Sequence, residues 1–228
     1  MLVYSHRGVC AQAPENTMAA FEAAVALGVD GIETDLRSSA DGQVVLFHDR
    51  LAPDGRPVSS LTRQELGAQV GYVVPTLASA LERHADIRWV LELKSPAALA
   101  PTLDILKSVP PANEVLVISF WHQVIAQIPD DGSLRRGVLF SHRPNDLSAA
   151  LAAIPSGVHT AVWNYEFIDE ELLRQAAAAG LQSLVYGPQS PADHADCAAV
   201  GLSGVITDHP EYLLPPDSGH PPSKSSGD

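Results

Sequence analysis

The stretch LVYSHRGVCAQAPENTMAAFEAAVALGVDGIETDL, residues 2–36, decides the fold. It begins with an apolar run at Leu2–Tyr4, continues through an alanine-rich segment with helical spacing at Thr17–Leu27, and returns to an apolar run at Gly31–Leu36. Asn16, directly before the helical segment, is the predicted N-cap. A strand, a helix and a second strand in this order are typical of parallel sheets, in which helices connect neighbouring strands.

The same alternation continues along the chain. Further strand-like runs lie at Trp89–Leu93, Val115–Ser119, Gly137–Phe140, Thr160–Trp163, Ser183–Tyr186 and Gly204–Thr207. Further helical segments lie at Leu77–His84, Ala97–Lys107, Asp146–Ala153, Glu170–Ala179 and Ala192–Val200. This repeated alternation predicts an α/β fold, a (β/α)8 TIM barrel, with a doubly wound open sheet as the alternative architecture.

One departure lies between the second and third strands. Residues 38–88 contain an extra apolar run at Val44–Phe47 and then a loop rich in glycine and proline, which predicts a small hairpin-like insertion. We expect one catalytic barrel over residues 1–214. Residues 215–228, PPDSGHPPSKSSGD, have no apolar periodicity and are expected to form a disordered tail.

Composition limits the possible partners. The chain has 228 residues, 46% of them hydrophobic, and its 14 Lys and Arg against 27 Asp and Glu give a net charge of −13. This charge argues against binding to nucleic acid or to an anionic membrane, whereas a small anionic substrate needs only one or two local cations. No apolar run is long enough for stable membrane insertion, and no secretory leader is evident, so we expect a cytoplasmic protein.

Polar side chains gather where the predicted strands end, which is where βα barrels place their reacting groups. These residues are His6, Arg7, Glu33, Asp35, His48, Glu92 and Lys94. Glu33 and Asp35 share one face of their strand because strand side chains alternate. An unpaired carboxylate inside a barrel is costly, so these acids are expected to bind a ligand. Together with Glu92 they form an all-oxygen set that suits Mg²⁺ or Ca²⁺.

The remaining candidates have both structural and functional interpretations. His6 and His48 could be ordinary hydrogen-bonding residues, but a pair of histidines beside a substrate can also donate and accept protons near neutral pH. Arg7 and Lys94 could pair with the acids or bind a phosphate group.

The order of these motifs along the chain resembles the glycerophosphodiester phosphodiesterase family. The matching segments are His6-Arg7-Gly8, Pro14-Glu15-Asn16-Thr17, Gly31-Ile32-Glu33-Thr34-Asp35, Phe47-His48-Asp49, Leu91-Glu92-Leu93-Lys94 and Gly204-Val205-Ile206-Thr207-Asp208-His209-Pro210. The likeness implies a (β/α)8 barrel, one divalent cation, and cleavage of a small glycerophosphodiester to glycerol phosphate and an alcohol.

The resemblance also implies a role for each candidate residue. It assigns acid and base catalysis to His6 and His48, metal binding to Glu33, Asp35 and Glu92, and phosphate binding to Arg7 and Lys94. It further implies that Glu15 touches the metal shell. The nucleophile would be the neighbouring glycerol hydroxyl, giving a cyclic phosphate, with direct attack by water as the alternative.

Two segments at the expected site rim, Leu51–Pro57 and Val185–Pro188, depart from the pattern that is common in the family. The choice of alcohol, as in glycerophosphocholine or glycerophosphoethanolamine, therefore stays open. Alternative functions are a barrel that binds metal and a phosphorylated ligand without turnover, and a lysophospholipase D-like enzyme acting on lysolipids. Sphingomyelinase D enzymes share the histidines and the acids but resemble the chain less well around Glu92. The sequence leaves the oligomeric state open.

Overall fold

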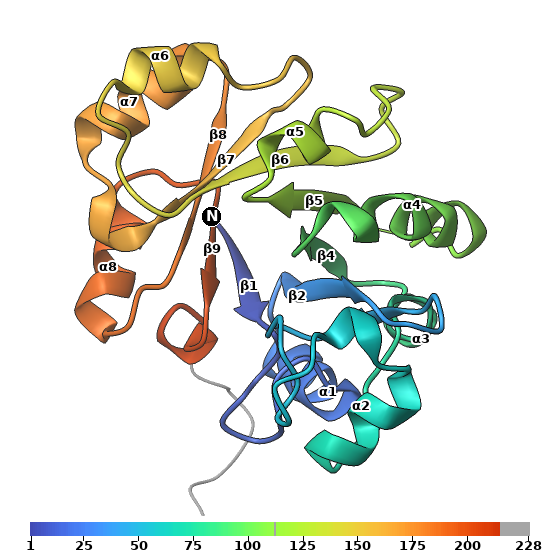
Figure 1. Cartoon of the computed structure of the whole chain (residues 1–228). Helices are drawn as coiled ribbons and strands as arrows, with labels where there is room; N and C mark the ends of the chain where they lie inside the picture. Colours follow the sequence, from blue (N-terminus) through green and yellow to red (C-terminus); the bar gives the residue numbers. More distant parts are fainter. Residues whose placement is uncertain (112, 215–228) are drawn as a thin grey trace, which may run out of the picture.

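A closed barrel forms the centre of the computed structural model, which describes residues 1–111 and 113–214 (Figure 1). Eight parallel strands of the described chain follow one another in the order β1-β9-β8-β7-β6-β5-β4-β2. Their bounds are β1 Leu2–His6, β2 Gly31–Ser38, β4 Arg88–Leu93, β5 Val115–Ser119, β6 Arg135–Phe140, β7 Thr160–Asn164, β8 Gln182–Tyr186 and β9 Gly204–Thr207. Because β1 also pairs with β2, the sheet has no open ends. The (β/α)8 prediction is confirmed, and the open-sheet alternative is excluded.

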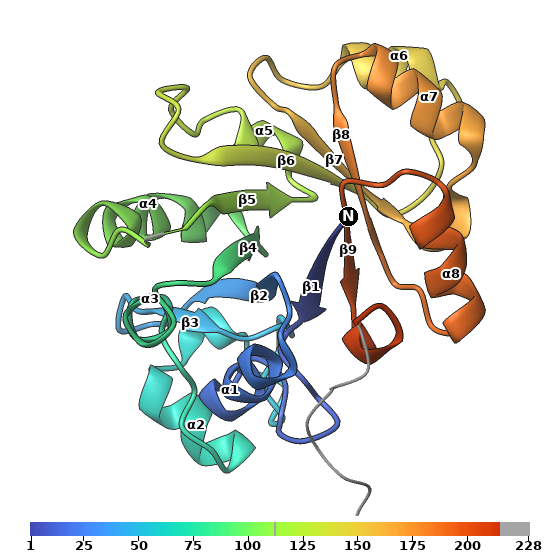
Figure 2. The ribbon, with the colours of Figure 1, turned by 180° about the vertical axis from the view of Figure 1, so that it is seen from behind.

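Helices surround the strands on the outside (Figures 1 and 2). The described helices around the barrel are α1 Met18–Leu27, α3 Leu77–Arg83, α4 Leu99–Ser108, α5 His122–Ile125, α6 Leu147–Ala152, α7 Glu170–Ala178 and α8 Pro191–Ala199. All of them except α5 lie close to segments predicted from the sequence. The four residues of α5 are too short a run to show helical periodicity.

The predicted insertion lies between β2 and β4. Strand β3, Val44–Leu46, pairs antiparallel with the end of β2, which confirms the hairpin. The insertion continues through helix α2, Arg63–Val70, which the sequence analysis missed and which lies beside α1 at the edge of the molecule (Figure 1). The sequence contained a signal for the start of this helix, because Thr62 and Glu65 have the spacing of a capping box and form one in the structure. The insertion has its own apolar cluster: Val45, Ala52, Val58, Leu61, Leu66 and Val74.

The inside of the barrel is divided along its axis. An apolar layer fills the interior with Tyr4, Val90, Leu116, Ile118, Leu139, Val162, Leu184 and Ile206. Two positions further along their strands, Tyr4 is followed by His6 and Val90 by Glu92, and strand alternation places these polar side chains above the same interior. The apolar layer therefore closes the barrel beneath the polar residues at the carboxyl ends of the strands.

The prediction that Asn16 caps the first helix was wrong. The N-cap is Thr17, which has an extended backbone and whose hydroxyl accepts a hydrogen bond from the backbone N–H of Ala20. Asn16 has a φ of 56°, in the left-handed region, and its side chain hydrogen bonds to β2 instead.

Two expectations from the sequence concern membrane insertion and the tail at the end of the chain. Among the described helices, none is both long enough and apolar enough to cross a membrane. The tail predicted for residues 215–228 lies outside the described residues.

Candidate active site

Three carboxylates meet at the carboxyl end of the barrel. The strand register pairs Asp35 on β2 with Glu92 on β4, and Glu33 with His6 on β1. Glu33, Asp35 and Glu92 are all buried, and one oxygen from each lies within 4.8 Å of the others. The two-residue spacing in β2 and the alignment of β2 with β4 thus bring together the acids expected from the sequence.

Crowding and burial change the proton affinities of these acids. Burial, followed by the charges of Asp35 and Glu92, raises the pKa of Glu33 well above its usual value. Burial also raises the pKa of Glu92, although Lys94 opposes this effect. For Asp35, burial acts in the same direction but Arg7 and Lys94 outweigh it, so the pKa of Asp35 is lowered. Asp35 is therefore the most strongly ionised of the three acids.

Two cations lie against the acid cluster. Arg7 Nε lies 3.0 Å from Asp35 Oδ2, and Arg7 Nη1 donates a hydrogen bond to Glu15 Oε2 at 2.9 Å. Lys94 Nζ lies 2.8 Å from Glu92 Oε1 and 3.3 Å from Asp35 Oδ1. Glu15 thus contacts Arg7 and is not one of the three clustered acids. The two cations offset only part of the negative charge of three buried carboxylates.

The donor set fits a hard divalent cation. Glu33 Oε2 is buried and has no hydrogen-bond partner among the described residues, and the buried Asp35 Oδ1 has only the ion pair with Lys94 at 3.3 Å. A buried carboxylate oxygen without a partner carries a large desolvation cost, which a bound cation removes. The three acids supply oxygen ligands only, which Mg²⁺ and Ca²⁺ prefer, whereas a zinc site more commonly includes nitrogen or sulfur ligands.

In each of the two histidines predicted to be catalytic, Nδ1 lies within hydrogen-bond distance of an aspartate carboxylate. His6 Nδ1 lies 2.8 Å from Asp208 Oδ1, and His6 Nε2 faces the acid cluster at 3.8 Å from Glu33 Oε2. His48 follows β3, and its Nδ1 lies 2.9 Å from Asp49 Oδ1. The backbone carbonyl of His48 accepts two hydrogen bonds from the Arg37 guanidinium, at 2.8 and 2.6 Å. Arg37 therefore ties the loop that carries His48 to β2.

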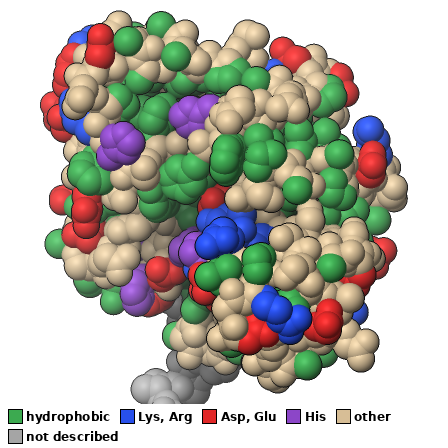
Figure 3. Space-filling view, in the orientation of Figure 1, with side chains coloured by type: hydrophobic (Ala, Val, Ile, Leu, Met, Phe, Trp, Pro, Cys, Tyr) green, Lys and Arg blue, Asp and Glu red, His purple; other side chains and the backbone are tan. Residues whose placement is uncertain are grey.

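Exposed aromatic side chains lie at another part of the barrel mouth. Phe120 and Trp121 follow β5, and 44% and 46% of their surfaces are exposed. Phe120 packs edge-to-face on Tyr186 at the end of β8, with ring centroids 6.4 Å apart. In Figure 3, hydrophobic side chains lie above a central group of basic, acidic and histidine side chains. The mouth thus has a charged group on β1, β2 and β4 and a group of aromatic side chains at the ends of β5 and β8.

Sequence reasoning assigned no role in the site to three residues that touch the candidate site residues. Asp208 binds His6, Asn16 donates a hydrogen bond to Asp35, and Arg37 holds the loop of His48. Asp208 and Asn16 lie in motifs shared with the family, and Arg37 extends the alternation of Glu33 and Asp35 by one step. The sequence pattern alone does not show that these three side chains contact the site residues.

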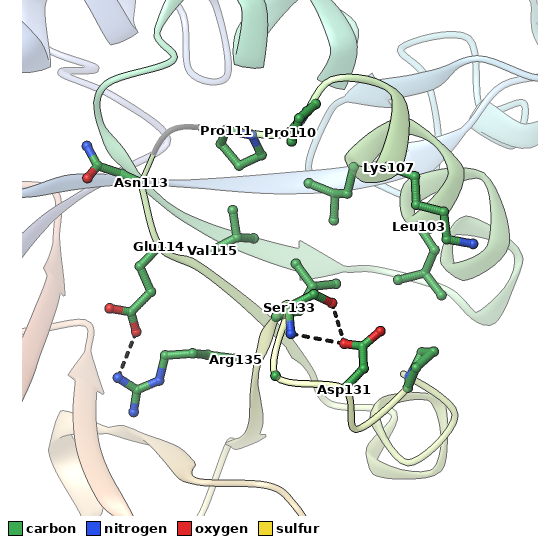
Figure 4. Close-up of a pocket in the computed structure, with 14 residues that line it drawn as sticks. Leu103, Lys107, Pro110, Pro111, Asn113, Glu114, Val115, Asp131, Ser133 and Arg135 are labelled. Carbon is green, nitrogen blue, oxygen red and sulfur yellow. Dashed lines mark hydrogen bonds and ion pairs between the residues drawn. The ribbon is translucent and has the colours of Figure 1, made fainter.

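A large cavity lies away from the acid cluster. A hollow of about 560 Å³ between the end of α4 and the starts of β5 and β6 is lined by Leu106, Lys107, Val115 and Arg135 among others (Figure 4). It lies at the amino ends of these strands, and none of the predicted site residues lines it. Because TIM barrels react at the carboxyl ends of their strands, the acid cluster and not this hollow is the candidate active site.

Relatives by sequence include glycerophosphodiester phosphodiesterases. A glycerophosphodiester phosphodiesterase of Caldanaerobacter subterraneus subsp. tengcongensis is 28% identical over 238 residues, covering 93% of this chain and 96% of that protein. The probable glycerophosphodiester phosphodiesterase 2 of Mycobacterium tuberculosis is 33% identical over 129 residues, covering 52% of this chain and 48% of that protein.

Solved structures share the fold over nearly the whole chain. A phosphodiesterase of Oleispira antarctica, in complex with the product sn-glycerol-3-phosphate, aligns with a TM-score of 0.81 and 25% identity, covering 93% of this chain and 95% of that one. A glycerophosphodiester phosphodiesterase of Thermotoga maritima aligns with a TM-score of 0.82 and 24% identity, covering 93% and 96%. Residues 6–212, from His6 to the turn after β9, match the glycerophosphoryl diester phosphodiesterase family. The chain belongs to that family of phosphoric diester hydrolases.

Proposed function

We propose that this barrel hydrolyses small glycerophosphodiesters, such as glycerophosphocholine or glycerophosphoethanolamine, to sn-glycerol 3-phosphate and an alcohol. The catalytic domain would span residues 1–214. One observation carries the proposal: His6, on β1, faces a cluster of three buried carboxylates and two cations at the reacting end of a barrel. A protein that only bound a phosphorylated ligand would not need a histidine held in this way.

The cation in this proposal is Mg²⁺ or Ca²⁺, with Glu33, Asp35 and Glu92 as its ligands. Glu33 Oε2 supports this assignment, because it is a buried oxygen without a hydrogen-bond partner among the described residues. When bound, the cation supplies positive charge that stabilises the developing negative charge on the phosphodiester.

Arg7 and Lys94 would bind the non-bridging phosphate oxygens. Both side chains are largely buried beside the acids, with exposed side-chain fractions of 16% and 12%. Ion pairs with Asp35 hold both cations, so little ordering of these side chains is required when substrate binds. Their charges act most strongly in a site that excludes water.

His6 and His48 would transfer the protons. The Nδ1 atoms of both rings are held by carboxylates, so the Nε2 atoms are the ones available to substrate. One histidine would take the proton of the attacking hydroxyl, and the other would protonate the departing alcohol oxygen. The attacking group in this proposal is the glycerol hydroxyl next to the phosphate. The product of that step is a cyclic phosphate, which water then opens.

A second candidate is an enzyme that acts on lysolipids. The exposed rings of Phe120 and Trp121 favour it, because they offer apolar surface at the barrel mouth against which the acyl chain of a lysolipid would pack. Both candidates share the reaction at phosphorus and differ only in the glycerol-bearing part of the substrate, which carries an acyl chain in a lysolipid.

A substrate panel tests both candidates. Glycerophosphocholine, glycerophosphoethanolamine, glycerophosphoglycerol, glycerophosphoinositol and lysophosphatidylcholine are each incubated with the protein, and sn-glycerol 3-phosphate and lysophosphatidic acid are measured. We expect release of sn-glycerol 3-phosphate from at least one water-soluble diester. Release of lysophosphatidic acid alone would favour the lysolipid enzyme, and no release from any compound would contradict the proposed function.

A further inference from the structure

Asn16 lies in the loop between β1 and α1, and its side chain contacts Asp35 of the acid cluster. Only 1% of its surface is exposed, and its φ of 56° is in the left-handed region. Its backbone N–H donates a hydrogen bond to the carbonyl oxygen of Arg7 at 2.9 Å, which closes the loop. The helix that follows is capped by Thr17, so capping does not explain why an amide side chain occupies this position.

The neighbours of Asn16 determine the orientation of its amide. Asn16 Oδ1 accepts hydrogen bonds from Thr34 Oγ1 at 2.6 Å and from the backbone N–H of Asp35 at 3.3 Å. The backbone N–H can only donate, so the oxygen of the amide must lie on this side. Asn16 Nδ2 then donates to Asp35 Oδ2 at 2.9 Å. A flipped amide would place its NH₂ group against an N–H donor.

We propose that Asn16 is a positioning residue that aims Asp35 into the cation site. Asp35 has two carboxylate oxygens, and Asn16 and Arg7 both lie against Oδ2. The other oxygen, Oδ1, is buried and lies 3.3 Å from Lys94 Nζ, which also contacts Glu92 of the acid cluster. The amide therefore fixes the Asp35 rotamer in which Oδ1 is directed toward the proposed divalent-cation site. This inference rests on the proposed function, because it requires that the cluster binds a cation.

Hydrogen bonds that hold a metal ligand in place typically change metal affinity by about 10–100-fold when they are removed. Asn16 has a second, separable task, because asparagine and glycine adopt the left-handed backbone more readily than other residues. Asn16→Gly removes the amide and keeps the backbone conformation accessible. Asn16→Ala removes the amide and also strains the backbone. The two variants therefore separate the side-chain role from the backbone role.

The test is calorimetric titration of chelator-treated protein with Mg²⁺ and, separately, with Ca²⁺. We expect both Asn16→Gly and Asn16→Ala to lower cation affinity by about 10–100-fold. In the metal-free state, we expect Asn16→Ala to have the lower melting temperature of the two. Circular dichroism checks that each variant is folded.

A second pair of variants covers the case in which both changes at Asn16 prevent folding. Thr34→Val removes the hydroxyl that binds Asn16 Oδ1, and Thr34→Ser keeps a hydroxyl as the matched control. We expect Thr34→Val to weaken cation binding and Thr34→Ser to keep the cation affinity near that of the wild-type protein.

Three outcomes would overturn the proposal. Wild-type affinity in Asn16→Gly, with weaker binding in Asn16→Ala, would mean that Asn16 serves only the backbone. Equal, wild-type affinity in all the folded variants would mean that the amide does not position Asp35. No cation binding by the wild-type protein would remove the metal site itself, and that failure is recognised from the wild-type titration alone.

Discussion

His6 Nδ1 and Asp208 Oδ1 lie 2.8 Å apart although 202 positions separate them in the chain. The closure of the barrel brings them together, because β1 pairs with β9 and places Ser5 opposite Thr207. An ionised carboxylate only accepts hydrogen bonds, so the ring proton of His6 is on Nδ1. The same contact lowers the pKa of Asp208. In the neutral ring, Nε2 then carries the lone pair and faces the acid cluster, as the proposed role of His6 as a general base requires.

Asp208→Asn should lower kcat by at least about tenfold, because a histidine that loses its orienting carboxylate can adopt the wrong tautomer. The asparagine is nearly isosteric, so the melting temperature should change little. Steady-state kinetics with glycerophosphocholine, together with thermal unfolding, measure both quantities. Unchanged kcat would show that Asp208 does not set the state of His6.

His6→Ala and His48→Ala should each reduce kcat by about 10²–10⁴-fold, the usual contribution of a general acid or base. Cation affinity should stay near that of the wild-type protein, since neither histidine is a proposed ligand. Circular dichroism and metal titration provide the controls. A loss of activity that follows the loss of folded protein would instead assign the histidine a structural role.

The acid cluster could be predicted because it depends on local rules. Two-residue alternation places Glu33 and Asp35 on one face, and βα barrels bring the carboxyl ends of their strands together. Glu92 follows from the same alternation one strand further along. The barrel itself follows from the repeated strand and helix pattern, and the β1–β2 pairing confirms it.

The contacts of Asn16 and His6, which support the acid cluster, cannot be predicted from the alternation of side chains along a strand. Asn16 has the side chain of a typical N-cap, but Thr17 beside it is also a favoured cap, and the hydrogen bonds to Thr34 and Asp35 decide between them. The predicted barrel places its last strand beside its first, but it does not show which side chain after β9 contacts His6. Tertiary geometry settles both points.

Glu33→Gln should stabilise the metal-free protein at neutral pH. The pKa of Glu33 is raised in the folded state, so the folded protein binds a proton more tightly than the unfolded chain does. Stability contributed in this way is present at low pH and is lost as pH rises from about 4.5 through the raised pKa. The glutamine amide of the variant does not titrate in this range. The variant therefore does not lose stability through deprotonation of residue 33 as pH rises.

The measurement is the melting temperature between pH 5 and pH 8 with chelator present. Wild-type stability should decline more steeply with rising pH than that of Glu33→Gln. Asp35 does not mask the effect, because its lowered pKa places its own contribution below about pH 4. Parallel curves for the two proteins would contradict the raised pKa of Glu33.

A substrate that lacks the hydroxyl next to the phosphate distinguishes the two routes of attack. An internal hydroxyl is already tethered close to phosphorus and has a high effective concentration. The deoxy analogue of glycerophosphocholine should therefore not be turned over, yet it should inhibit competitively through Arg7 and Lys94. Comparable turnover of the analogue and its parent would mean that water attacks directly.

The most direct test of the central claim is release of sn-glycerol 3-phosphate by the wild-type protein before chelation, after chelation, and after Mg²⁺ or Ca²⁺ is added back. The substrate is the most active diester of the panel. Because Glu33, Asp35 and Glu92 form a buried oxygen cluster that includes an atom without a hydrogen-bond partner among the described residues, activity should disappear with chelator and return with one of the two ions. Full activity in excess chelator, with no metal found by elemental analysis, would contradict the account.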